Sequence, residues 1–119
     1  MTQPETEHYL ALNGKYLAEA EALLKKGDYV QASEKFWGAA AEIVKAVAKE
    51  RGVTLRAHRS ISEFVSTLDE ERPDLGLALL FHAANNLHTN FYEDWLDPKM
   101  VEKGAEAVRS FVIKMKQLL

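Results

Sequence analysis

The spacing of apolar residues is the feature that most restricts the fold of this chain. In every long segment the apolar side chains return at intervals of three and four residues, and no segment alternates as a half-buried strand would. The sequence therefore predicts an all-α protein. We expect a single domain over residues 1–119, folded as an up-and-down bundle of four to five helices. The expected helices cover roughly residues 5–26, 29–51, 60–71, 75–95 and 98–119.

Local signals place the ends of these helices. Gly27 tolerates the left-handed conformation that commonly ends a helix, and Asp28 is a good cap for the next one. Ser60 begins a Ser-x-x-Glu pattern, which predicts a capping box at the start of the third helix. Asp97 followed by Pro98 is typical of a helix start, because proline is well tolerated at the first helical position.

The second expected helix, residues 29–51, carries apolar residues around an unusually wide arc. A wide apolar arc indicates that a helix packs against more than one neighbour. Gly38 falls on the opposite, polar side of this helix, where glycine costs about 1 kcal/mol relative to alanine. We interpret Gly38 as a surface glycine, although it would also admit the close approach of a partner.

Composition excludes several classes of function. Fifteen basic residues against eighteen acidic ones give a net charge of -3, so we predict no general affinity for DNA. The chain lacks cysteine, which suits a reducing cytoplasm, and we expect the protein there. Neither a signal peptide at the start nor an apolar run of membrane-spanning length is recognisable, so no membrane association is expected.

Residues 75–95 divide into two faces when projected at 100° per residue. The face expected to enter the core holds Leu77, Leu80, Ala84, Leu87, Phe91 and Trp95. The opposite face holds His82, Asn85, Asn86, Thr89 and Glu93, with Asn90 and Tyr92 at its margins. Such side chains exchange hydrogen bonds in confined surroundings. We therefore predict that they form a homodimer interface or line a ligand site; a hydrogen-bonded polar patch over a dimer contact is the alternative.

The four histidines do not predict a metal site. His82 and His88 lie six residues apart, hence about 120° apart around a helix, so they do not converge as a pair spaced by four would. His8 and His58 are expected in solvent. The chain also lacks a Gly-rich phosphate loop, a nucleophile elbow and a paired-carboxylate motif. We accordingly expect no metal ion and no cofactor.

Two segments resemble a known family. Residues Lys26 to Ala41 (KGDYVQASEKFWGAAA) and Leu87 to Glu93 (LHTNFYE), followed by a closing helix, are similar to the archaeal PaREP family, which belongs with the HEPN helical domains. The resemblance covers nearly the whole chain. It implies a four- or five-helix bundle that dimerises through its later helices. Many HEPN proteins are metal-independent ribonucleases, whose motif is an arginine, four to six residues, then a histidine.

That motif is incomplete in this chain. His88 matches the histidine position, but His82 stands six residues earlier, where the resemblance implies an arginine. Arg72 lies too far upstream to replace it. In the implied reaction the histidine acts as general acid or base and the arginine stabilises charge on the phosphoryl oxygens. Histidine at position 82 would do so only when protonated.

Three functions follow as hypotheses. The first is a non-catalytic HEPN-like homodimer that binds a nucleotide or a partner protein, such as a small nucleotidyltransferase, through the polar face of residues 75–95. The second is a toxin-like endoribonuclease that cleaves RNA. In that enzyme His88 is the acid or base, His82 or a partner arginine stabilises phosphate, and Asn85, Asn90 and Tyr92 orient the substrate. The third is a structural dimer without a ligand.

Overall fold

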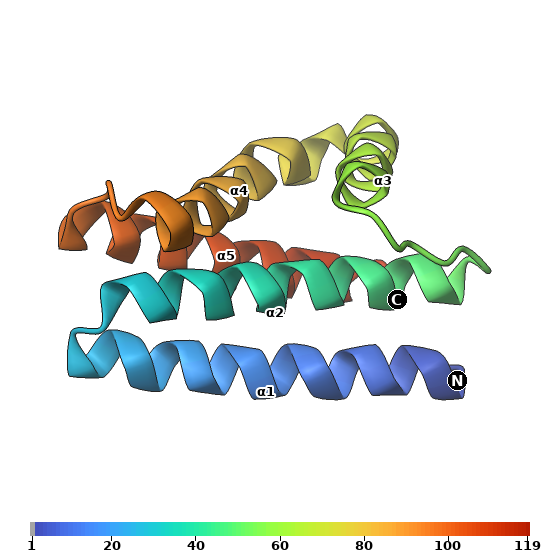
Figure 1. The fold of residues 1–119 in the computed structure, drawn as a ribbon. Coiled ribbons are helices and arrows are strands. Elements are labelled where there is room, and N and C mark those ends of the chain that lie inside the picture. The colour runs from blue at the N-terminus through green and yellow to red at the C-terminus, as the bar shows by residue number, and fades with distance from the viewer. Residues whose placement is uncertain (1) are drawn as a thin grey trace.

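The computed structural model describes residues 2–119, and in that range the chain forms five α-helices and one short 3-10 helix, with no strand. The elements are α1 (Pro4–Lys26), α2 (Tyr29–Glu50), α3 (His58–Glu71), η1 (Pro73–Leu75), α4 (Leu77–Glu93) and α5 (Pro98–Lys116). Helices α1 and α2 form a long antiparallel pair, α4 crosses α2 obliquely, and α3 stands nearly perpendicular to it (Figure 1). The all-α bundle predicted from the sequence is confirmed.

Most predicted helix ends are confirmed at the level of hydrogen bonds. Gly27 adopts a φ of 81°, and its N–H bonds to the last turn of α1. The carboxylate of Asp28 accepts a hydrogen bond from the N–H of Gln31 at the start of α2. Asp97 does the same for Met100 at the start of α5, with an N···O distance of 2.8 Å. These caps satisfy N–H groups that the helix itself leaves unpaired.

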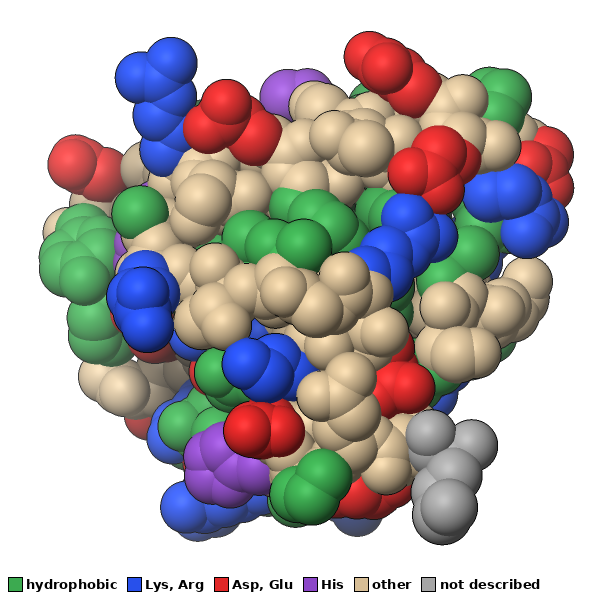
Figure 2. All heavy atoms as spheres, turned by 90° about the vertical axis from the view of Figure 1, so that its right-hand side faces the viewer, with side chains coloured by type: hydrophobic (Ala, Val, Ile, Leu, Met, Phe, Trp, Pro, Cys, Tyr) green, Lys and Arg blue, Asp and Glu red, His purple; other side chains and the backbone are tan. Residues whose placement is uncertain are grey.

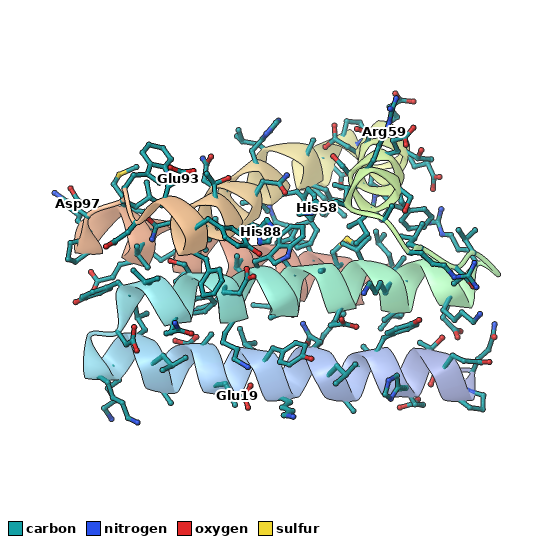
Figure 3. All side chains as sticks on the ribbon, viewed as in Figure 1. Glu19, His58, Arg59, His88, Glu93 and Asp97 are labelled. Carbon is teal, nitrogen blue, oxygen red and sulfur yellow. The ribbon has the colours of Figure 1, made fainter. Side chains whose placement is uncertain are left out.

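The predicted start of α3 was wrong by two residues. The helix begins at His58, and Ala57 occupies the N-cap position. Ser60 lies inside the first turn, where its hydroxyl accepts from the N–H of Ala57 and donates to the carbonyl of the same residue. A serine in the first turn can therefore cap a helix from within. The earlier start brings His58 onto the helix, next to α2 and α4 (Figure 3).

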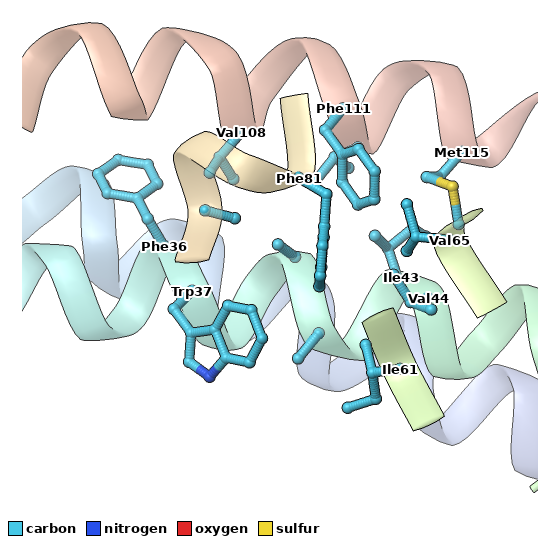
Figure 4. Close-up of a cluster of buried hydrophobic side chains, with 14 of the residues drawn as sticks. Phe36, Trp37, Ile43, Val44, Ile61, Val65, Phe81, Val108, Phe111 and Met115 are labelled. Atoms are coloured by element: carbon cyan, nitrogen blue, oxygen red, sulfur yellow. The ribbon is translucent and has the colours of Figure 1, made fainter. Parts of the chain in front are cut away.

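Helix α2 lies at the centre of the core, as its wide apolar arc predicted. It packs against α1, α4 and α5, and it contributes more buried residues than any other helix. Figure 4 shows its large side chains interleaved with those of the later helices. The labelled members of this cluster are Phe36, Trp37, Ile43, Val44, Ile61, Val65, Phe81, Val108, Phe111 and Met115. Helix α1 is peripheral and buries only Thr6, Asn13 and Ala20.

Two buried polar residues of α1 form hydrogen bonds with α2. The amide nitrogen of Asn13 donates to the carbonyl of Ala39 at 2.7 Å, and the hydroxyl of Thr6 donates to the carboxylate of Glu50 at 2.7 Å. Gly38 also faces α1, because a Cβ placed there would lie 3.2 Å from the ring of Tyr16. The interpretation of Gly38 as a surface glycine was therefore wrong: it allows the Tyr16 ring to approach α2.

Two helical glycines are expected to respond oppositely to alanine. A Cβ on Gly104 would lie 2.7 and 2.9 Å from the Cδ2 and Cγ of buried Leu87. We expect Gly104→Ala to lower the free energy of unfolding by about 1–2 kcal/mol, because overpacking of α4 against α5 exceeds the gain in helix propensity. Gly14→Ala is the matched control, since no atom lies within 4 Å, and should raise that free energy by about 0.5–1 kcal/mol. Urea unfolding measures both changes; a stabilising Gly104→Ala would contradict this packing.

The ion pair between α1 and α5 gives stability a dependence on pH. Arg109 donates two hydrogen bonds to Glu21, at 2.6 and 2.7 Å, and thereby lowers the pKa of the Glu21 carboxyl below 4.5. A carboxyl with a lower pKa in the folded protein adds stability above its unfolded pKa, and this is lost as pH falls through the folded value. The side chains are 39% and 41% exposed, so the contribution is about 0.5–1 kcal/mol.

We therefore expect Glu21→Gln to destabilise the protein slightly near neutral pH. The difference from wild type should shrink as pH falls below 4.5, because the wild-type carboxyl then becomes protonated as well. Urea unfolding at a series of pH values checks this. A difference that grew on acidification would show that another interaction is responsible.

The surface carries both signs of charge. Figure 2 shows the end of the bundle where both chain ends lie, and there Lys and Arg side chains are interspersed with Asp and Glu around a strip of hydrophobic side chains. Across the described residues, no helix has both the length and the apolar character needed to cross a membrane.

Candidate functional site

His88 forms the best-defined polar contact on the inner side of α4. Its Nδ1 lies 2.7 Å from Oε1 of Glu34 on α2, and the two side chains are only 24% and 29% exposed. An ionised carboxylate only accepts hydrogen bonds, so Nδ1 carries the proton in this pair. In a neutral ring, Nε2 then holds the lone pair. A carboxylate that fixes the tautomer and orientation of an imidazole is a common arrangement in catalytic and binding sites.

His58 brings a second imidazole to the same place. Its ring stacks on the indole of Trp37, with centroids 4.4 Å apart and planes 16° apart, and its centroid lies 4.8 Å from that of His88. The indole also touches His88, at 4.9 Å between centroids. Figure 3 shows both imidazoles in the space between α2 and the pair α3 and α4. His58 is exposed, as the sequence predicted, yet its ring is held in place by stacking.

Two further side chains of α4 complete the group. The amide oxygen of Asn85 lies 3.4 Å from Nε2 of His58, and the phenol ring of Tyr92 meets His88 edge to face at 5.4 Å. Tyr92 is 69% exposed, so the group opens to solvent on this side. We call Glu34, Trp37, His58, Asn85, His88 and Tyr92 the imidazole cluster.

The helix geometry explains how the cluster assembles. Asn85, His88 and Tyr92 are spaced by three and four residues, which puts them on one side of α4. Glu34 and Trp37 are three residues apart on α2 and face the same gap. The cluster offers aromatic and imidazole rings that stack on planar ligands, together with imidazole nitrogens that donate or accept hydrogen bonds.

His82 does not belong to the imidazole cluster. It is exposed and borders a small depression of about 90 Å³ between α3 and α4, together with Ser62, Ser66 and Asn85. The sequence predicted His82, or an arginine of a partner protomer, as the phosphate-stabilising group, and placed His82 about 120° from His88 around the helix. His82 and His88 point to different sides of α4. Of the predicted site residues, only Asn85 borders both the depression beside His82 and the imidazole cluster.

Asn90 was assigned to a ligand or interface role, and the structure contradicts that assignment. It is fully buried inside the chain. Its amide nitrogen donates to the hydroxyl of Ser33, and its oxygen accepts from the N–H groups of Trp95 and Leu96. Asn90 therefore closes the turn between α4 and α5. Asparagine suits this place because one side chain both donates and accepts.

The remaining predicted residues lie on the outer side of α4. Asn86, Thr89 and Glu93 are exposed, and the hydroxyl of Thr89 donates to the carbonyl of Asn85 within the helix. Trp95 was expected in the core but is 57% exposed. The reason is that α4 ends at Glu93, where Asp94 takes a left-handed conformation and turns the chain away.

Sequence reasoning missed Glu34, Trp37 and His58 as site residues. The available signal was the pairing of Glu34 with Trp37 on one side of a helix that is otherwise largely apolar. No local pattern indicated their contact with His88, which lies 54 residues along the chain from Glu34. Among residues 2–119 no group of three His, Asp or Glu side chains converges into a metal-binding set.

Comparison with known families identifies the chain. The sequence model of the archaeal PaREP1/PaREP8 family matches residues 8–112, which include both segments that carried the resemblance and all of the imidazole cluster. The chain belongs to this family. The membership of the archaeal PaREP family that the two segments predicted is thus confirmed.

A solved structure supports the fold of this PaREP1/PaREP8 chain. The crystal structure of a Sulfolobus solfataricus protein is similar to it, with a TM-score of 0.79 and 29% sequence identity. The similarity covers 90% of this chain and 95% of the other. A comparison with curated proteins gives no significant match.

Proposed function

We propose that this PaREP1/PaREP8 chain is a HEPN-like module that binds a nucleotide or single-stranded RNA at the imidazole cluster. The observation that carries the proposal is the fixed His88, held by Glu34 and flanked by His58, Trp37 and Tyr92. Unpaired bases stack on exposed aromatic and imidazole rings, and sequence-tolerant binding of single strands commonly uses such surfaces. The exposed ring of Tyr92 gives a base access to the cluster.

Fluorescence anisotropy with a labelled single-stranded oligouridine tests this function. We expect His88→Ala to weaken binding about tenfold, since it removes a ring from the stacking surface and leaves Glu34 without its partner. His82→Ala is the matched control on the same helix, and it should bind as wild type because His82 lies outside the cluster. Equal weakening by both variants, or by neither, would contradict the proposed site.

We also propose that the outer side of α4 forms a homodimer interface. Leu79 is 76% exposed, and exposed His82, Asn86 and Thr89 continue the same side of the helix. An exposed apolar residue followed along a helix by amide and hydroxyl side chains is typical of a protein–protein contact. Such a surface excludes water and buries no charged group. Sedimentation at micromolar concentration tests the dimer. A small nucleotidyltransferase is the alternative partner for the outer side of α4. This alternative would be favoured if the chain sedimented as a monomer and bound such a protein through Leu79.

Endoribonuclease activity is the second candidate function, and the pairing of two imidazoles favours it. The His58 ring centroid lies 4.8 Å from that of His88, so His58 can serve as a second proton-transfer group beside it. The arginine of the HEPN motif has no replacement in the cluster, since Arg59 points away from it (Figure 3). The experiment that separates binding from cleavage is argued in the Discussion.

A further inference from the structure

Basic residues are concentrated in the chain on both sides of His58, and the proposed function does not yet use them. Residues 43–62 hold five of the fifteen basic residues and only one of the eighteen acidic ones, although the whole chain has a net charge of -3. The one acidic residue, Glu50, contacts the start of α1, where its carboxylate accepts from the N–H of Gln3 and the hydroxyl of Thr6. Such a local excess of basic side chains in an acidic protein is typical of a surface that binds an anion.

Two of the arginines near α3 are already paired with carboxylates. Nη1 of Arg51 lies 2.9 and 3.0 Å from the two carboxylate oxygens of Glu71, at the end of α3. Arg72 donates from Nε and Nη2 to the two oxygens of Asp74, at 3.0 and 2.9 Å. The charges of these two guanidinium groups are therefore compensated within the chain.

Arg56 and Arg59 lack a partner of this kind. Arg56 is exposed and makes no side-chain hydrogen bond or ion pair within residues 2–119. Arg59 lies 3.6 Å from a carboxylate oxygen of Glu63, but the two side chains are 90% and 69% exposed, and such surface pairs contribute little. A guanidinium carries five donors in a fixed fork whose geometry matches phosphate. Both arginines therefore remain able to bind a phosphate from outside the chain.

The backbone keeps these two arginines beside the imidazole cluster. Arg56 comes two residues before His58 and Arg59 comes directly after it, and the His58 ring is held on the indole of Trp37. Two α-carbons separated by one residue are at most about 7.6 Å apart. The connection that carries Arg56 is itself anchored, because Leu55 is only 8% exposed and belongs to the hydrophobic core. A strand that leaves the cluster on the α3 side therefore passes within reach of both arginines.

An RNA strand supplies the anions that would pair with Arg56 and Arg59. Each nucleotide brings one phosphate, and proteins that stack the bases of a single strand commonly place basic side chains along its backbone. Arg59 points away from the cluster (Figure 3), so it is placed for the phosphate of a neighbouring nucleotide and not for the nucleotide that stacks on His88. A mononucleotide would occupy the cluster and leave both arginines unused.

We propose that Arg56 and Arg59 bind the phosphates of an RNA strand that continues from the imidazole cluster past the start of α3. The inference rests on the proposed RNA binding. It adds the class of ligand, which is a strand and not a mononucleotide, and the side on which the strand leaves the cluster. Arg51 and Arg72 take no part, because carboxylates of the chain already hold them.

The salt dependence of RNA binding measures these contacts. Fluorescence anisotropy with a labelled uridine hexanucleotide, repeated at a series of potassium chloride concentrations, gives the slope of log Kd against log salt concentration. Each phosphate contact with a single strand adds about 0.7 to this slope, because binding releases counterions. We expect Arg56→Gln and Arg59→Gln each to lower the slope by about 0.7, and the double variant to lower it by about 1.4.

Arg72→Gln is the matched control. It removes the same charge beside the same helix, but Asp74 holds its guanidinium, so the slope should equal that of wild type. Uridine 5′-monophosphate as an unlabelled competitor gives a second comparison. Arg56→Gln and Arg59→Gln should leave its inhibition constant unchanged, whereas His88→Ala should weaken binding of both the monophosphate and the hexanucleotide.

The outcomes separate this inference from the proposed function. An unchanged slope in either arginine variant, or an equal decrease in Arg72→Gln, would overturn the phosphate contacts; the RNA site would stand if His88→Ala still weakened binding. Weaker binding of the monophosphate by the arginine variants would place both arginines at the stacked nucleotide and overturn the continuing strand. Failure of the hexanucleotide to bind would overturn both proposals.

Discussion

Replacing Asn90 with alanine is expected to lower the free energy of unfolding by about 3 kcal/mol, the largest loss we expect from a single polar residue. The side chain makes three hydrogen bonds of 2.7 to 3.0 Å in a fully buried place. Alanine removes all three and leaves the N–H groups of Trp95 and Leu96 without an acceptor. A buried N–H group without an acceptor lowers the free energy of unfolding by more than the net contribution of the hydrogen bond that it has lost.

Ser33→Ala is the matched control for Asn90→Ala in urea unfolding. It removes one partner of the Asn90 amide but leaves the two backbone contacts of the α4–α5 turn in place. We expect it to cost about 1 kcal/mol. Equal losses for the two variants would show that the turn does not depend on Asn90, and would reopen its assignment to a ligand site.

The second large effect concerns RNA cleavage. If the cluster is catalytic, one imidazole takes the proton from a ribose 2′-hydroxyl as its oxygen attacks phosphorus. The other imidazole protonates the departing 5′-oxygen, which leaves a 2′,3′-cyclic phosphate and a 5′-hydroxyl. Removing a positioned acid or base slows such a step by about 10²- to 10⁴-fold. We therefore expect His88→Ala and His58→Ala each to lose at least about 99% of the cleavage rate.

Incubation of each variant with single-stranded RNA and EDTA measures this loss. His82→Ala should cleave at the wild-type rate, because it stands apart from the other two histidines. Residual cutting that is equal in wild type, His58→Ala and His88→Ala would mark a contaminating nuclease. In that case the chain is a binding module, and the anisotropy experiments alone define its function.

Helix boundaries were predictable where a local chemical signal fixes them. Gly27, Asp28 and Asp97 act on neighbours within four residues, so their effect is visible in the sequence. The start of α3 was missed because Ser60 caps the helix from inside its first turn, a geometry that the same Ser-x-x-Glu pattern does not distinguish. The end of α4 was missed because Asp94 takes a left-handed conformation usually left to glycine.

The site was predictable only in part, because its contacts join distant segments. His88 was identified from the polar residues around it on α4, but Glu34 and His58 reach it only after α2, α3 and α4 have packed. Asn90 illustrates the opposite error. A polar residue on an apolar helix suggested a ligand, whereas the turn between two helices needed a buried hydrogen-bonding side chain.

The chain has four histidines, which makes one measurement especially direct. Imidazole nitrogen signals from ¹⁵N-labelled protein can be followed while a single-stranded RNA hexamer is added. Binding at the imidazole cluster predicts that the signals of His58 and His88 move together, while those of His8 and His82 stay in place. Shifts confined to His8 or His82, or RNA binding that leaves His58 and His88 unchanged, would contradict the proposed site.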